Sequence, residues 1–415
     1  MQIIIRILGV VILVWGVFSL PAQELHINGY VRNYTGVLLN GNNEYAIIQN
    51  TLDLKFEQSK DVVAFKLNPF IYQYPDQDMT FHLREAYVDL YFPSLDLRIG
   101  KQQIIWGKAD GVFITDIVSP KDLSEFLLRD FDEIRMGVTG IKANYYSGNS
   151  TLEMVWLPMF TPTIYPQNNS IWAFRPRLPL PAVPVTIDHS REAVAPTLGN
   201  SELFVRYSLM TSLADVELMA ASTWDDDPTP HVVRQIDPDS HQVLGVTVFP
   251  EHHRLTMAGG SFSTTVGPAV LRGEGGYYRG KHFVSTDPHA FEGVVQKNYV
   301  HYLVGIDYSL WGWKFSGQFI QQIILDYTDD LIWDEHDNMM TFLARGDYLN
   351  ETLHLEFFAY MGLNHQDALL RPKITYDIAD GVSILLGANL FTGSEGLFGQ
   401  FDQNDMAYFK LKYSF

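Results

Sequence analysis

Two histidines have neighbours at spacings that could support hydrolysis. Ser261 follows His252 by nine residues, and Glu356 follows His354 by two, so a general base could activate a hydroxyl group or a water molecule. Neither pair belongs to a Gly-x-Ser-x-Gly or His-Glu-x-x-His motif, and the sequence contains neither motif. We therefore expect no catalytic residue, and a hydrolase is the least favoured class.

Acidic side chains gather in two places and could attract a cation. Calcium loops use oxygen ligands in the order Asp-x-Asp-x-Asp-Gly, which is missing here. The chain has no Cys, which excludes disulfides and thiolate metal sites. We expect solvated acidic loops, with calcium as the alternative, and no cofactor. The two groups are Asp225, Asp226 and Asp227, and Asp326, Asp329, Asp330, Asp334 and Glu335.

The most informative stretch, residues 84–123, begins with two alternating segments. Apolar and polar residues alternate with period two on both sides of the dipeptide at 93–94, which predicts two antiparallel strands joined by a two-residue turn. This turn fixes the register, and the polar face then carries an ion pair and an aromatic ring over a glycine. The predicted pairs are Asp89 with Arg98, Tyr87 with Gly100, and Glu85 with Gln102.

Composition limits the class of protein. The 415 residues are 13% aromatic with a mean hydropathy of -0.03, which gives no sign of multiple membrane helices. The net charge of -19 argues against a nucleic-acid partner. Residues 1–22 are predicted to be a signal peptide, with Arg6 before an apolar run and Ala22 before the cut. An uncleaved membrane anchor is the alternative.

From residue 23 to 415, alternating segments of about ten residues recur in pairs. Eight short turns and nine longer connections predict an all-β fold, a transmembrane antiparallel β-barrel of 18 strands with long extracellular loops and both termini on the turn side. The segment 243–249 also alternates, but counting it would make the strand number odd, so we assign it to a loop. The last strand ends on Phe415 and resembles the strand that bacterial outer-membrane proteins present to their barrel assembly machinery. The predicted location is therefore the bacterial outer membrane.

The block from Leu83 to Leu123 resembles a large family of outer-membrane barrels described as a domain of unknown function. The resemblance rests on Arg98-Ile-Gly-Lys-Gln102, on Trp106-Gly107 and on the segment 116–123, Asp-Ile-Val-Ser-Pro-Lys-Asp-Leu. Ser119 stands where relatives often have Asn. The resemblance implies a porin-like or export-associated barrel and supplies no substrate.

Two loops are expected to carry the function. Residues 161–199 are rich in proline and predict an extended extracellular loop over the mouth. Residues 106–134 are expected to fold inward, with Ser119 capping a short helix from Pro120 to Arg129. The predicted lumen and constriction residues are Glu85, Tyr87, Asp89, Arg98, Gln102, Trp106, Asp116, Asp122, Arg129 and Arg345.

The expected function is a porin-like channel for small solutes, or for export of a hydrophobic or amphiphilic compound. Inward charges of both signs predict weak ion selectivity. The alternative is a non-conducting barrel for surface binding or adhesion. The expected partners are outer-membrane lipid, the assembly machinery, a small solute and, for export, an inner-membrane exporter.

Overall fold

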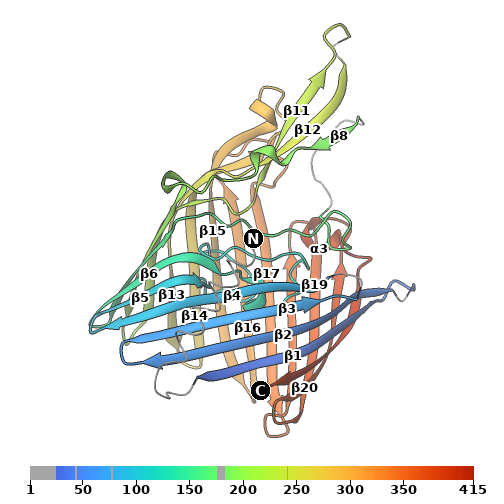
Figure 1. The fold of residues 1–415 in the computed structure, drawn as a ribbon. Helices are drawn as coiled ribbons and strands as arrows, with labels where there is room; N and C mark the ends of the chain where they lie inside the picture. The colour runs from blue at the N-terminus through green and yellow to red at the C-terminus, as the bar shows by residue number, and fades with distance from the viewer. Residues whose placement is uncertain (1–24, 43, 76–77, 175–182, 241) are drawn as a thin grey trace, which may run out of the picture.

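The computed structural model describes residues 25–42, 44–75, 78–174, 183–240 and 242–415, and its wall is one closed antiparallel β-sheet (Figure 1). The predicted signal peptide lies outside the described residues. Neighbours in the sequence pair along the wall, and the first strand also pairs with the last, which closes the barrel. The wall strands are β1 (His26–Leu38), β2 (Tyr45–Lys60), β3 (Val63–Gln73), β4 (Thr80–Phe92), β5 (Leu95–Gln102), β6 (Val138–Ser147), β7 (Ser150–Leu157), β9 (Glu202–Met210), β10 (Asp215–Trp224), β13 (Arg254–Val266), β14 (Ala269–Val284), β15 (Val294–Leu310), β16 (Trp313–Ile324), β17 (His336–Tyr348), β18 (Leu353–Gly362), β19 (Asp367–Ala379), β20 (Val382–Thr392) and β21 (Met406–Ser414).

The predicted count of 18 wall strands is confirmed. A second, three-stranded sheet stands beyond the rim at the loop end of the barrel (Figure 1). It contains β8 (Val185–Ile187), β11 (Thr229–Ile236) and β12 (Val243–Glu251). Residues 243–249 thus lie outside the wall, as expected, but they form a strand of this second sheet. The described helices are single turns: α2 (Phe131–Ile134), α3 (Gly396–Gly399) and three 3₁₀ turns at His189–Arg191, Leu198–Asn200 and Phe291–Gly293.

The hairpin of β4 and β5 has the predicted register, with Asp89 opposite Arg98 and Tyr87 opposite Gly100. A Cβ atom at Gly100 would lie 3.1 Å from the Cβ of Tyr87, and φ is +132°, so glycine suits this position. The ladder ends at Ala86, and the predicted pair of Glu85 with Gln102 is not part of it. Instead, Glu85 accepts a hydrogen bond from the backbone N of Gln103 (3.0 Å), because the chain leaves the sheet there.

The outside of the wall is apolar and carries aromatic side chains toward the turn end. Val88, Ile99 and Val304 are among the exposed aliphatic residues on wall strands. Trp311, in the turn between β15 and β16, is 90% exposed, and Phe415 is 47% exposed. Apolar bands flanked by aromatic residues are typical of sheets that face lipid. Across the described ranges, no helix has the length and apolar content needed to cross a bilayer.

Candidate functional site

Residues 103–137, which connect β5 to β6, fold into the barrel; we call them the lumen loop. Its first arm is fixed by Trp106, which is 1% exposed and donates from Nε1 to Glu153 Oε1 on β7 (2.5 Å). The backbone N of Lys108 then donates to Glu274 Oε2 on β14 (2.5 Å). The loop therefore leaves the β5 side and binds strands farther round the wall.

The tip of the lumen loop is Asp110 with Gly111. The Asp110 carboxylate accepts hydrogen bonds from Arg272 on β14 and from Ser316 Oγ on β16 (3.1 Å). Tyr360 on β18 donates from its hydroxyl to the Gly111 carbonyl (2.9 Å). The tip is thus bound to three different wall strands.

The returning arm runs back toward the first and last strands. Arg371 on β19 donates to the carbonyl groups of residues 127 and 128 (2.9 and 3.1 Å). Lys410 on β21 lies 3.0 Å from Asp130, and Arg32 on β1 lies 2.8 Å from Glu133. With contacts to β1, β7, β14, β16, β18, β19 and β21, the loop crosses the lumen from wall to wall.

The predicted helix from Pro120 to Arg129 is wrong. Residues 124–127 form a turn in which Phe126 has a φ of +54°, and the helical turn α2 begins only at Phe131. The Asp122 side chain bonds to the backbone N of Ser124 (3.1 Å), a local turn that competes with helix. Ser119 does not cap a helix, because its hydroxyl accepts from the backbone N of Ile104 (2.9 Å).

The apolar part of the lumen loop packs at the loop end of the barrel. The Phe126 ring centroid lies 4.8 Å from that of Phe401 and 6.1 Å from that of Phe398, both in the connection between β20 and β21. Trp172 and Phe174 of the Pro-rich loop 161–199 join this cluster. Phe126 thus packs against neighbouring loops and against Phe391 on the wall strand β20 (6.2 Å), whereas the tip and both arms bind the wall inside the barrel. The prolines at 176, 179 and 181 lie outside the described residues.

Burial and charge act in opposite directions on the carboxylates of Glu133 and Asp130 in the returning arm. Burial disfavours ionisation of Glu133, but the Arg32 guanidinium outweighs it and holds the pKa of Glu133 below its usual value. Burial acts likewise on Asp130, and Lys410 with Arg32 lowers its pKa well below the ordinary range. Both carboxylates are therefore ionised and bind the wall as charged groups.

The predicted site residues fall into separate groups. Arg98 binds Asp89 through two bonds (2.7 and 2.9 Å) and lies 3.8 Å over the Tyr87 ring, while Glu85 binds Lys66 (3.0 Å). Within the lumen loop, Asp116 binds Arg135 (2.6 Å) and the backbone N of Trp106 (3.1 Å), and Asp122 binds Arg129 (3.2 Å). Gln102 is buried and donates to the Gly140 carbonyl (3.4 Å). Arg345 lies apart from these groups, on β17.

The sequence reasoning missed most of the residues that hold the loop. Arg32, Glu274 and Arg371 are wall residues whose alternation places them inside, but nothing in their spacing shows which of them meets the loop. Asp110 lies in irregular backbone and Glu133 lies in the single helical turn α2, and neither segment is long enough for periodicity to give information. Long-range contacts alone identify them.

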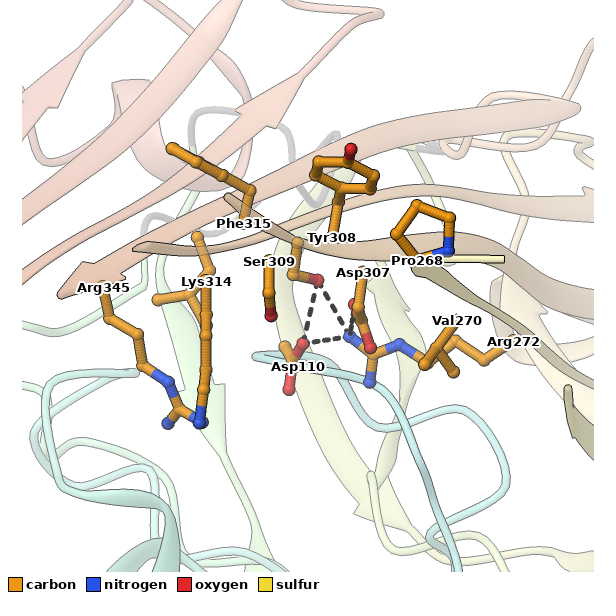
Figure 2. Close-up of a pocket in the computed structure, with 12 residues that line it drawn as sticks. Asp110, Pro268, Val270, Arg272, Asp307, Tyr308, Ser309, Lys314, Phe315 and Arg345 are labelled. Carbon is orange, nitrogen blue, oxygen red and sulfur yellow. Dashed lines mark hydrogen bonds and ion pairs between the residues drawn. The ribbon is translucent and has the colours of Figure 1, made fainter. Parts of the chain in front are cut away.

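Two cavities lie between the loop tip and the turn end of the barrel. One has a volume of about 230 Å³ and is lined by Asp110 with three wall cations, Arg272, Lys314 and Arg345 (Figure 2). The other has a volume of about 290 Å³ and is lined by Lys108 with Glu153, Arg206 and Glu217. Both linings are strongly charged.

The residue pairs considered for hydrolysis are not assembled. His252 bonds to the Asp225 carbonyl (2.7 Å) and Ser261 to Glu217 (2.8 Å). Glu356 binds Lys373 (3.0 Å), and His354 lies between two aspartates.

The acidic run 225–227 is occupied by cations of the chain itself. Lys281 lies 2.7 Å from Asp225 and Lys121 lies 3.6 Å from Asp226. In the described part of the chain, no three His, Asp or Glu side chains are placed to hold a metal ion.

Solved barrels share this fold at low sequence identity. Acinetobacter baumannii OccAB3 is 11% identical with a TM-score of 0.53, covering 94% of this chain and 99% of its own. Pseudomonas aeruginosa OpdK with vanillate (10%, TM-score 0.54) and OccK2 (OpdF) with glucuronate (12%, TM-score 0.53) each cover 94% of this chain and 98% of their own. The fold is thus that of outer-membrane porins. No curated protein matches the chain by sequence.

A family model matches residues 50–415, which is most of the chain and all but the first of the wall strands in full or in part. The chain belongs to the family described as "Protein of unknown function (DUF1302)".

Proposed function

We propose that this protein is an outer-membrane channel for small polar solutes and that the lumen loop is its constriction. The observation that carries the proposal is the path of residues 103–137, which bind the wall from β1 and β21 across to β16 and β18. An 18-stranded barrel has a lumen too wide for wall side chains alone to fill, so an inserted loop sets the passage.

The outside of the barrel supports its place in the outer membrane. The exposed aliphatic residues of the wall strands would meet lipid chains, and the aromatic residues near the turns would meet the lipid headgroups. β21 ends one residue before Phe415, and this strand would be presented to the barrel assembly machinery. The low-identity fold similarity to outer-membrane porins is in keeping with the proposed membrane location and with the proposed route of assembly.

The cavities favour polar solutes. Each is lined by charged side chains, which suits a hydrated or ionic solute better than a hydrophobic or amphiphilic compound. Export of such a compound, with an inner-membrane exporter as partner, is therefore the weaker form of the proposal. Vanillate and glucuronate, which accompany two of the solved barrels, give a range of solute size to test.

Single-channel recording in planar bilayers tests the proposal. Replacing residues 109–131 with a short Gly-Ser bridge removes the tip and most of the returning arm, and conductance should rise several-fold. A matched control deletes residues 232–248 from β11 and β12, which stand beyond the rim, and should leave conductance unchanged. Heat-modifiable gel mobility verifies that both variants are folded.

The two remaining outcomes are informative. A folded loop-deletion variant that conducts like the parent would show that the lumen loop is not the constriction. A protein that never conducts, with or without the loop, would favour the adhesion alternative. The sheet of β8, β11 and β12 is the feature that favours this second function, because it projects beyond the barrel.

A further inference from the structure

Lys314 and Arg345 form a pair of like charges on neighbouring strands. They are directly opposite each other in the register of β16 and β17, and Figure 2 shows both side chains pointing to the same side of the sheet, away from the Phe315 ring. Within the described ranges, neither forms an ion pair. Glu356, which is opposite Arg345 on β18, is bound by Lys373 (3.0 Å). The cationic pair therefore faces the lumen without a carboxylate of its own.

Arg272, the third cation of this cavity, is bound by Asp307 on β15 (3.0 Å) and by a second carboxylate, which the lumen loop brings in. Asp110 Oδ2 is bound by Arg272 Nη2, by Ser316 Oγ (3.1 Å) and by Gln318 Nε2 (3.1 Å). Figure 2 shows Asp110 and Arg272 beside the cationic pair. Arg272 and a hydroxyl and an amide donor make the set that a small organic carboxylate would use. Asp110 thus sits where the anionic group of a solute would sit.

The charge of the lining is positive. Three cations, Arg272, Lys314 and Arg345, face two carboxylates, Asp110 and Asp307. If Asp110 left, the excess would rise from one positive charge to two. The cavity volume of about 230 Å³ lies below the roughly 300–1,000 Å³ of pockets for drug-sized ligands, so it suits a small solute.

We propose that this cavity binds a small organic carboxylate and that Asp110 is its internal competitor. The proposal rests on the channel function and adds the solute class. A solute carboxylate arriving at Lys314 and Arg345 repels the Asp110 carboxylate and competes with it for Arg272. The loop tip then loses its bonds to β14 and β16, so binding of the solute loosens the constriction that it must pass.

Calorimetry on the purified full chain in detergent measures binding without conduction. Benzoate, benzyl alcohol and benzylamine share one ring and differ in charge, and benzoate should bind at least about tenfold more tightly than the other two. The double variant Lys314→Gln with Arg345→Gln should lose at least about tenfold in benzoate affinity. Asp110→Asn removes the competing carboxylate and should raise benzoate affinity by about threefold or more.

Lys55→Gln is the matched control. Lys55 lies on β2 with the same inward alternation as Asp53, far round the wall from β16, and its replacement should leave benzoate affinity unchanged. Heat-modifiable mobility confirms that each variant is folded. Three results would overturn the proposed site. They are equal affinity for the three ring compounds, a loss of benzoate affinity in Lys55→Gln as large as in the double variant, and weaker benzoate binding in Asp110→Asn than in the parent.

The two proposals fail separately. If the variants change benzoate binding as predicted but the barrel never conducts, the carboxylate site is supported and the channel function is refuted. If the barrel conducts but binds benzoate no better than benzyl alcohol, the channel function is supported and the carboxylate site is refuted.

Discussion

The bond between Arg32 and Glu133 gives the sharpest test of how the lumen loop is held. Arg32 Nη1 and Nη2 lie 2.8 and 3.0 Å from the two carboxylate oxygens, and the side chains are 5% and 7% exposed. Replacing one partner of a buried ion pair costs about 3–5 kcal/mol, because the other charge is left uncompensated. Tyr30 still donates to Glu133 (2.5 Å). Arg32→Met should therefore lower the free energy of opening the lumen loop by about 3 kcal/mol, at the lower end of this range.

The double variant Arg32→Met with Glu133→Gln separates the charge from the contact. With Gln at position 133 no unpaired charge remains buried. The free energy of opening the lumen loop should then fall by only about 1 kcal/mol, the usual contribution of the lost hydrogen bonds. At about 1.4 kcal/mol for each factor of ten, the single variant should speed local opening by about a hundredfold and the double by less than about tenfold.

Hydrogen exchange followed by mass spectrometry measures this opening in peptides that cover residues 103–137. The control Arg98→Met removes a wall arginine that binds Asp89 and not the loop, so exchange in the lumen loop should stay at the parent rate. Exchange that rises less than about tenfold in Arg32→Met, or rises equally in the double variant, would refute the reasoning.

Three further predictions concern other parts of the molecule. Arg98→Ala breaks the partly solvated ion pair with Asp89 and should lower the free energy of unfolding by on the order of 1 kcal/mol. The same variant should shift ion selectivity toward cations, and an unchanged reversal potential would place Arg98 outside the permeation path. Burial raises the pKa of Asp226 to about 8 and outweighs the opposite effect of Lys121, so the folded carboxyl keeps a proton that the unfolded chain loses above about pH 4. The loop at 225–228 should therefore lose stability as pH rises from 4 to 8, and Asp226→Asn should flatten this dependence in amide exchange corrected for intrinsic rates. Cysteine at Arg345 should react with aqueous thiol reagents in intact outer membranes and cysteine at Val88 should not; the reverse pattern would contradict the orientation of the wall.

The wall could be predicted from the sequence because its signals are local. Alternation sets which residues face inward, two-residue turns set the register, and the requirement for an even number of strands placed 243–249 outside the wall. The hairpin with Asp89 opposite Arg98 follows from the turn at 93–94 alone. Such features need no knowledge of distant residues.

The lumen loop could not be predicted because distant residues decide its shape. The i, i+3 and i+4 spacing of Leu123, Phe126 and Leu127 favours a helix, yet Arg371 binds the carbonyl groups of 127 and 128, and Phe126 packs on Phe401. Such contacts outweigh helix propensities of less than about 1 kcal/mol per residue. For the same reason, the sequence did not show that Asp110 would occupy Arg272 and leave Lys314 and Arg345 open.

The returning arm of the lumen loop also bears on how the barrel is assembled. Glu133 binds Arg32 on the first strand and Asp130 binds Lys410 on the last, and these strands pair only when the barrel closes. Lys410 is 280 residues downstream of Asp130, so this contact forms late and at a high entropic cost of closing the chain. An assembly intermediate with an open seam would therefore expose its lumen loop to proteases, and sealing the seam would seat the loop in the same cooperative step. The barrel would therefore be narrowed from the moment that it closes.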